Sequence, residues 1–123
     1  MKIQESAENY LETILVLSLD KPYVRSIDIA NELGFSKPSV SVAMKNLRNS
    51  GHIRVDENGH ITLAPPGKKI AEMIYERHRL LSQWLESLGV NKETASEDAC
   101  RIEHVISEES FAAIKDHLKQ TSV

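Results

Sequence analysis

Three side chains that can bind metal ions lie close together near the C-terminal end of the chain, in the segment Cys100-Arg-Ile-Glu103-His104. Their spacing of i, i+3 and i+4 places them on one face of a helix, about one turn apart. A thiolate, a carboxylate and an imidazole directed at one point provide most of the ligands of a transition-metal site. The segment therefore predicts a metal-binding face.

Each of these residues also has an ordinary structural interpretation. A single cysteine is more often a small buried hydrophobic residue than a ligand, and the glutamate and histidine could be solvated surface groups. The triplet is more specific than any one member, because three ligand types rarely share one helix face by chance. A closed site needs further ligands. The candidates are His78, which lies near an apolar stripe, and Asn9 and Glu12, which are three residues apart.

The ligand types narrow the choice of metal. A thiolate and an imidazole disfavour Mg²⁺ and Ca²⁺, which prefer oxygen ligands, whereas the mixed set suits Fe²⁺, Mn²⁺, Co²⁺, Ni²⁺ or Zn²⁺. The single cysteine excludes the Cys-x-x-Cys pairs of many structural zinc sites, and no His-Glu-x-x-His motif of a hydrolytic zinc enzyme is present. We therefore expect a metal sensor and not an enzyme.

A helix-turn-helix followed by a hairpin is predicted in the first half of the chain. Apolar spacing indicates an amphipathic helix over residues 4–19, and Ser26 is expected to cap a second helix that ends before Gly34. Ser36-Lys-Pro38-Ser39 opens a third helix, so that the short link between the two has the turn chemistry of a helix-turn-helix. The strands around Asn58-Gly59 then form a β-hairpin, which directly after a recognition helix is a wing.

Three helices are expected in the second half, which gives a mainly α fold with a small β wing. A long helix begins at Pro65-Pro66, a fifth covers about 92–106, and Ser107 caps a sixth that ends near residue 119. Residues 1–65 are thus expected to form an N-terminal winged helix-turn-helix DNA-binding domain. Residues 66–123 are expected to form a helical metal-binding and dimerisation domain.

The distribution of charge supports a partner of negative charge. Residues 36–69 carry six lysines and arginines against two carboxylates, a net charge of +4, and the rest of the chain carries −7 because the total is −3. A basic middle between acidic ends fits a DNA-contacting module attached to an acidic sensing module.

No apolar run approaches the roughly 20 residues that span a bilayer, no signal peptide is evident, and the one cysteine cannot form an intrachain disulfide. We expect a cytoplasmic protein without a membrane partner.

The exposed side of the third helix is the predicted DNA-contacting surface. Serine hydroxyls and the helix N-terminus suit phosphates, whereas Pro38 and Val42 suit thymine methyl groups. No Arg, Gln or Asn stands in the first two turns for a bidentate base contact, so DNA shape is expected to contribute to recognition. The expected DNA-contacting residues are Ser36, Lys37, Pro38, Ser39, Ser41, Val42, Lys45 and Arg54.

These motifs resemble the diphtheria toxin repressor and manganese transport regulator family of metal-dependent transcriptional repressors. The resemblance covers nearly the whole chain, and its most specific part surrounds the metal-binding triplet. It is carried by the segments Glu8-Asn-Tyr10-Leu-Glu12-Thr-Ile14, Ser26-Ile-Asp28-Ile-Ala30, Ser36-Lys-Pro38-Ser39-Val40-Ser41, Leu63 to Gly67-Lys68, Arg77-His78-Arg79-Leu80-Leu81 and Asp98-Ala-Cys100-Arg-Ile-Glu103-His104-Val-Ile-Ser107. The chain would be a short form without the SH3-like domain of longer members.

The resemblance implies a ligand set that mixes two branches of the family. The family's metal ligands fall on Asn9, Glu12, His78, Cys100, Glu103 and His104. Iron-type members have Cys at the position of Cys100, where manganese-type members have Glu, and Glu12 matches a manganese-type ligand. Asn9 departs from both branches, and an ancillary site is not expected because Ser82 and Ser96 replace its ligands. Fe²⁺ is expected first and Mn²⁺ second, with Zn²⁺, Co²⁺ or Ni²⁺ as ions that would bind in vitro.

The implied function is repression by a homodimer that binds a double-stranded DNA operator when loaded with a divalent transition metal, in control of metal homeostasis genes. Metal affinity and DNA affinity would then be reciprocally linked. The C-terminal helices carry more apolar side chains than they can hide alone, which together with the resemblance predicts a dimer interface. Its expected residues are Trp84, Leu85, Leu88, Phe111 and Ile114. The alternative is a metal-independent winged-helix DNA- or protein-binding module, in which the metal-binding triplet is incidental.

Overall fold

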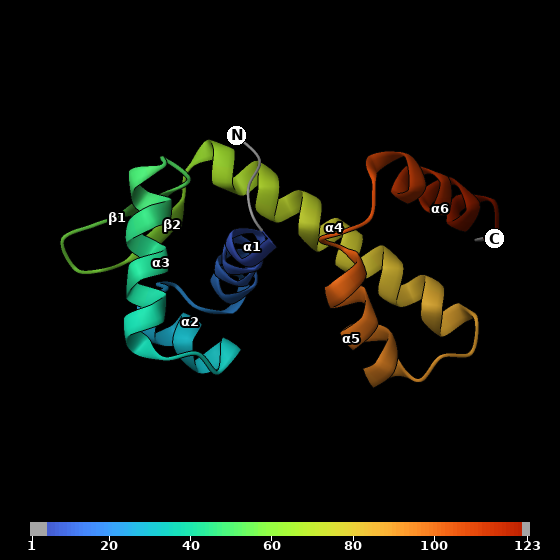
Figure 1. Ribbon diagram of the computed structural model, residues 1–123, viewed down its shortest axis with the longest axis horizontal. Coiled ribbons are helices and arrows are strands. Elements are labelled where there is room, and N and C mark those ends of the chain that lie inside the picture. Colours follow the sequence, from blue (N-terminus) through green and yellow to red (C-terminus); the bar gives the residue numbers. More distant parts are fainter. Residues whose placement is uncertain (1–4, 122–123) are drawn as a thin grey trace. The chain divides into compact units, whose positions relative to one another are not determined.

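Helices dominate the structure, a computed structural model that describes residues 5–121 (Figure 1). Its elements are α1 (Glu5–Asp20), α2 (Ser26–Leu33), α3 (Lys37–Asn49), β1 (Ile53–Val55), β2 (Ile61–Leu63), α4 (Pro65–Ser87), α5 (Lys92–Ile102) and α6 (Glu108–Thr121). The chain forms two compact units, residues 1–73 and 74–123, and α4 contributes to both. The predicted mainly α fold with a small wing is confirmed. Within the described residues, no helix is long and apolar enough to cross a membrane.

The core of the first unit is built from one apolar face of each of its helices. Leu11 and Ile14 of α1, Ile29 of α2 and Val40 of α3 are almost completely buried. Three- and four-residue spacing brings such side chains to one side of a helix, and burying each one stabilises the fold by roughly 1.5–3 kcal/mol. The first unit is therefore held by contacts among α1, α2, α3 and the hairpin.

The link between α2 and α3 has the predicted turn chemistry. Gly34 adopts φ 70°, and its N–H donates to the carbonyl of Ala30, which ends α2. The Ser36 hydroxyl caps α3 by accepting from the N–H of Ser39 at 3.3 Å, and Pro38 lies in the first turn. These contacts close the helix-turn-helix.

The start of α2 differs from the prediction. Ser26 is the first helical residue and not the cap; the cap position belongs to Arg25. The carboxylate of Asp28 accepts a hydrogen bond from the N–H of Arg25 at 2.9 Å, so an acidic side chain inside the helix reaches back to the position before it. This contact, with Lys21 nearby, lowers the pKa of Asp28.

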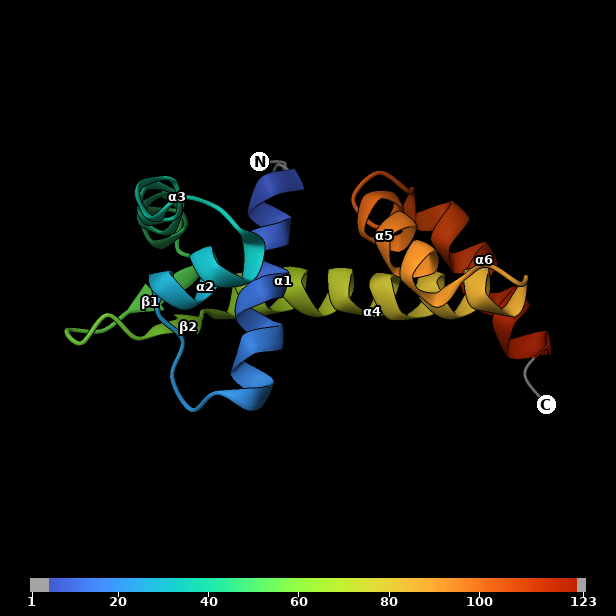
Figure 2. The same cartoon turned by 90° about the horizontal axis from the view of Figure 1, so that it is seen from below.

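The wing is a two-stranded antiparallel hairpin in which Ile53 pairs with Leu63. Its turn is ordered by Asp56, whose carboxylate accepts from the N–H groups of Asn58 and His60 at 2.8 and 2.9 Å. Gly59 completes the turn with φ 78°. Figure 2 shows the turn of the hairpin projecting beyond the helices of this unit.

The base of the wing is attached to the loop before α2. The ring of His60 stacks on Tyr23 with centroids 4.2 Å apart, and its Nε2 lies 3.1 Å from a guanidinium nitrogen of Arg25. The N–H of Ile61 donates to the carbonyl of Val24 at 2.7 Å. The wing is therefore fixed to the helix-turn-helix by contacts distant in sequence.

The second unit packs α5 and α6 against the C-terminal part of α4. Its core consists of Leu81, Ala99 and Phe111, with Trp84 and Ile114 among the side chains packed around them. Ser107 accepts a hydrogen bond from the N–H of Ser110 at 3.0 Å, which confirms its predicted role as the cap of α6.

The fifth helix is shorter than predicted. It ends at Ile102 and not at residue 106, because the N–H groups of Val105 and Ile106 both donate to the carbonyl of Ile102 and close a tight turn. Glu103 keeps helical backbone angles, φ −58° and ψ −26°, as the residue after the helix. Glu103 and His104 thus lie in the turn that follows α5.

Candidate metal centre

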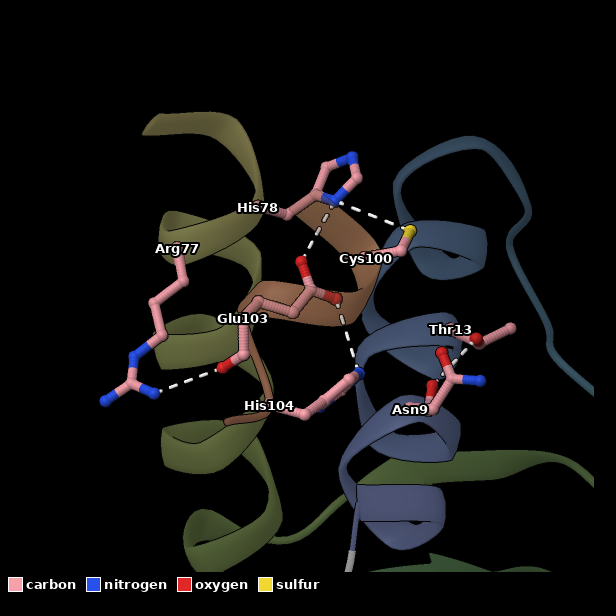
Figure 3. Close-up of polar contacts among 7 residues, drawn as sticks. All are labelled: Asn9, Thr13, Arg77, His78, Cys100, Glu103 and His104. Atoms are coloured by element: carbon pink, nitrogen blue, oxygen red, sulfur yellow. Dashed lines mark hydrogen bonds and ion pairs between the residues drawn. The ribbon is translucent and has the colours of Figure 1, made fainter. Parts of the chain in front are cut away.

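Three of the predicted ligands meet in the second unit. One ligand atom each of His78, Cys100 and Glu103 lies within 4.8 Å of the other two. The Nδ1 atom of His78 is 2.9 Å from Oε2 of Glu103 and 3.7 Å from Sγ of Cys100 (Figure 3). Ligand atoms bound at about 2.0–2.3 Å from one ion are separated by distances of this size. The three atoms are therefore close enough to share an ion.

The elements explain this convergence. Cys100 lies in the last turn of α5, and Glu103 follows the helix with helical backbone angles, so the i, i+3 relationship is preserved although the helix has ended. His78 comes from α4, which packs beside α5 (Figure 3). The cysteine is exposed, whereas the glutamate is completely buried.

The carboxylate of Glu103 is the most constrained group of the site. Its Oε2 atom contacts His78, while its Oε1 atom accepts no hydrogen bond from the described residues and lies 3.5 Å from Nε2 of His104. A buried carboxylate oxygen without a full set of donors is unfavourable unless a cation lies nearby. A thiolate, an imidazole and this carboxylate together fit a divalent transition metal, and the unsatisfied oxygen supports that assignment.

The electrostatics of His78 reflect its two neighbours. The hydrogen bond with the Cys100 sulfur and the hydrogen bond with the Glu103 carboxylate raise the pKa of His78 from 6.5 to about 10, although partial burial opposes the change. The imidazole is thus protonated at neutral pH in the absence of metal. Because a metal needs a neutral nitrogen, a proton and a metal compete for this ring.

One residue of this region was not singled out by sequence reasoning. The side chain of Arg77 is buried, and its Nη1 donates to the carbonyls of Glu103 and Ile106, each at 3.1 Å. Its guanidinium also lies 5.5 Å from the centroid of the Phe111 ring. In the sequence, the only indication of a role for Arg77 was its position next to the candidate ligand His78. Its partners are main-chain carbonyls, which every residue carries and which therefore leave no pattern in a sequence.

The remaining predicted ligands have different positions. His104 lies beside the site through its contact with Glu103, and its side chain is almost completely buried. Asn9 and Glu12 belong to α1 in the first unit. The carbonyl of Asn9 accepts from the hydroxyl of Thr13 at 2.8 Å, a contact that does not use its amide side chain (Figure 3). Ligation by Asn9 and Glu12 stays a prediction.

The predicted DNA-contacting residues are all exposed on the first unit. They are Ser36, Lys37, Pro38, Ser39, Ser41, Val42, Lys45 and Arg54. The opposite side of α3 is buried through Val40, Met44 and Leu47. The Ser36 hydroxyl donates to Oγ of Ser39 at 2.8 Å, so its hydrogen is already used within the helix cap. Of these two serines, Ser39 is the better phosphate donor.

The predicted dimer residues differ in how much surface they offer. Leu88 is 63% exposed, whereas Phe111 is only 8% exposed because it belongs to the core of the second unit. Trp84, Leu85 and Ile114 are half-buried. Phe111 can therefore contribute little area to a partner, and the role of the other four stays a prediction.

Comparisons with known proteins extend these observations. Residues 2–61 match the family model for the N-terminal DNA binding domain of the iron dependent repressor, and residues 64–123 match the model for its metal binding and dimerisation domain. The chain belongs to the iron-dependent repressor family. The family resemblance found in the sequence is confirmed, and with it the winged helix-turn-helix fold and the class of metal-dependent transcriptional regulators.

Individual members of the iron-dependent repressor family are similar over most of the chain. The transcriptional regulator MntR of Salmonella typhimurium is 34% identical over 110 residues, which are 89% of this chain and 70% of that protein. The HTH-type transcriptional regulator MntR of Lysinibacillus sphaericus is also 34% identical, over 90% of this chain and 80% of its own length.

Solved structures of family members share the fold. A manganese-dependent transcriptional repressor in complex with manganese is 28% identical, with a TM-score of 0.84 over 92% of this chain and 52% of that chain. The IdeR protein of T. acidophilum is 27% identical, with a TM-score of 0.79 over 100% of this chain and 56% of that chain. The chain thus spans about half the length of these solved chains.

Proposed function

We propose that this member of the iron-dependent repressor family binds a divalent transition metal through His78, Cys100 and Glu103 and represses transcription in the metal-bound state. The convergence of three ligand atoms within 4.8 Å carries this proposal. His104 is the fourth proposed ligand because it lies against the second oxygen of the same carboxylate. Family membership supports Asn9 and Glu12 as further ligands from α1, where amide and carboxylate oxygens would complete a mixed set.

The proposed nucleic-acid partner is a double-stranded operator. The exposed side of α3 would lie in the major groove, and Lys37 and Arg54 would contact phosphates. Since bidentate base contacts are not available early in α3, sequence preference would come from Val42, the serines and DNA shape. A homodimer with two such helices would recognise two half-sites about one DNA turn apart. The repressor would act in the cytoplasm, where a single thiol stays reduced.

The proposed metal is Mn²⁺ first and Fe²⁺ second, the reverse of the order expected from Cys100. Similar proteins of known structure are described as manganese regulators, which supports Mn²⁺. The sulfur ligand favours softer ions, which supports Fe²⁺. A bound ion would neutralise the charge of the buried Glu103 carboxylate and would connect the residues that ligate it. The surrounding protein holds the His78 imidazole and the Glu103 carboxylate in position to bind the ion.

DNA selection with and without metal tests this function. A pool of randomised duplexes is selected by the protein with Mn²⁺, the enriched sequence is labelled, and its affinity is measured by fluorescence anisotropy with Mn²⁺ and with chelator. We expect metal to strengthen binding by at least about tenfold, the scale of ordinary allosteric coupling. Glu103→Gln should lose this response, whereas Glu97→Gln on the exposed side of α5 should retain it.

The alternative function, a metal-independent winged-helix module, predicts a different outcome. Its DNA affinity would be the same with Mn²⁺ and with chelator, and Glu103→Gln would bind DNA like the wild type. Sedimentation equilibrium at micromolar concentration tests the homodimer separately, and a monomer with and without metal would contradict that part of the proposal.

A further inference from the structure

We propose that Arg77 is a positioning residue for the metal site: it holds the turn of residues 103–106 so that the Glu103 carboxylate faces His78. This inference rests on the proposed metal-binding function. It concerns a residue that touches no ligand atom and acts through the main chain of its neighbour.

Glu103 is held both at its main chain and at its carboxylate. Arg77 donates to the main-chain carbonyl of Glu103, and the next residue of α4, His78, contacts the carboxylate of the same residue. Two consecutive residues of one helix therefore hold the backbone and the side chain of a single ligand (Figure 3). Because both ends are held, the carboxylate has little freedom to turn away from His78.

The turn after α5 needs a hydrogen-bond donor from outside the helix. Glu103 follows the last residue of α5, and the final carbonyls of a helix have no partner within it. Arg77 donates to two carbonyls of this turn, those of Glu103 and Ile106, each at 3.1 Å. Without these hydrogen bonds, the carbonyls of buried Glu103 and half-buried Ile106 would lose their donor, and the turn would have to rearrange to expose them to water.

Arg77 is itself held in place. Its side chain is buried, and its guanidinium lies 5.5 Å from the centroid of the Phe111 ring. A buried cation is stabilised by carbonyls at the C-terminal end of a helix and by an aromatic face. The turn and the guanidinium therefore stabilise each other, and neither can move freely.

The experiment compares Arg77→Met with Arg79→Met. Methionine keeps the unbranched apolar part of the side chain and removes the guanidinium. Arg79 lies two residues away on the same helix, is exposed, and has its guanidinium 5.9 Å from the centroid of the Tyr75 ring. The control thus removes the same charge. Binding of Co²⁺ is followed by its sulfur-to-metal absorption, at a temperature at which circular dichroism shows each variant folded.

The expected result is a weaker affinity of Arg77→Met for Co²⁺ by about 10- to 100-fold, the usual effect of losing a group that orients a ligand. Arg79→Met should remain within about twofold of the wild type. Equal affinities for the wild type and Arg77→Met would overturn the inference. If Arg77→Met does not fold, Arg77→Lys is measured in its place. Lysine keeps the positive charge but lacks the planar guanidinium that donates to two carbonyls, so wild-type affinity for Co²⁺ in Arg77→Lys would also overturn the inference.

A second measurement does not depend on metal. Hydrogen exchange of the Val105 and Ile106 amides in the metal-free protein should be at least about tenfold faster in Arg77→Met than in Arg79→Met, because the turn opens more often. Unchanged exchange would overturn the inference. Failure of the proposed function has a different signature, since the wild type itself would then show no Co²⁺ absorption.

Discussion

The imidazole of His78 and the carboxylate of Glu103 lie 2.9 Å apart although 25 residues separate them in the chain. This contact brings two proposed metal ligands together, and it also favours a proton on the imidazole, which a metal would have to displace. The same arrangement therefore organises the site and makes its use dependent on pH.

The first prediction concerns pH and the metal-free protein. The pKa of His78 is raised from 6.5 to about 10 in the folded state, so its protonated form stabilises the fold fully below pH 6.5. This contribution is lost as the pH rises toward 10. The melting temperature in chelator should therefore fall between pH 7 and 10, and His78→Gln should remove this part of the decrease.

The metal-bound protein should respond to pH in the opposite direction. Ligation requires a neutral imidazole. At pH values below the pKa of His78, a bound Mn²⁺ ion displaces one proton from the ring, so Mn²⁺ affinity should increase by about tenfold per pH unit. Calorimetric titrations in buffers of different ionisation enthalpy measure this proton release directly. An affinity that is constant between pH 6.5 and 8.5 would be incompatible with ligation by His78.

The second prediction concerns Cys100. Cys100→Ala should lose much of the affinity for Zn²⁺ and Co²⁺ and should abolish the sulfur-to-cobalt absorption in the near ultraviolet. Cys100→Glu should retain activation by Mn²⁺ and lose the preference for softer ions. Ser96→Ala, on the same helix, serves as the control. If Co²⁺-loaded wild type lacks the band and Cys100→Ala responds to metal like the wild type, Cys100 is not a ligand.

The third prediction concerns Lys37 and Arg54, both exposed on the first unit. Lys37→Ala and Arg54→Ala should each weaken binding to all DNA sequences alike and reduce the slope of log affinity against log salt by about one unit. Lys119→Ala removes the same charge from α6 and should leave the slope unchanged. A large change in sequence preference at constant slope would show that the residue contacts bases.

The fourth prediction concerns Gly67 in the first turn of α4. A β-carbon at this position would overlap with the carbonyl oxygen of His52 and press against Leu11. In an ordinary helix, replacing glycine by alanine stabilises by roughly 0.5–1 kcal/mol, but here Gly67→Ala should destabilise by about 1–3 kcal/mol. Urea denaturation measures the free energy of unfolding. Lys68→Ala, at the next exposed position, should leave it nearly unchanged, and a stabilised Gly67→Ala would disprove the close contact.

Much of the first unit could be predicted from the sequence because its signals are local. Gly34, the Ser36 cap and the Asn58-Gly59 turn each act within a few residues, and the structure has a helix end, a helix start and a hairpin there. The cap of α2 was wrongly assigned to Ser26. The Asp28 carboxylate bonds the N–H of Arg25, so that Arg25 takes the cap position and the helix begins one residue earlier than a serine cap would place it.

The convergence of three candidate metal ligands was predictable in part from their residue types, but the surroundings of the candidate site were not. The spacing of Cys100 and Glu103 indicated one helix face, and these two residues do meet there with His78. The early end of α5 could not be predicted, because apolar Ile106 continues the helical pattern beyond the turn. The contacts of Arg77 were not predictable at all, since its partners are carbonyls that every residue carries.

The difference in exposure between Cys100 and Glu103 has a kinetic consequence. The sulfur is open to solvent, the imidazole is half-buried, and the carboxylate is completely covered. In the proposed site, an ion arriving from solution would meet the exposed sulfur first and would have to lose bound water before it reached the buried carboxylate. The rate of metal binding should then rank ions by their affinity for sulfur and by how readily they lose water, while the equilibrium affinity would depend on the carboxylate.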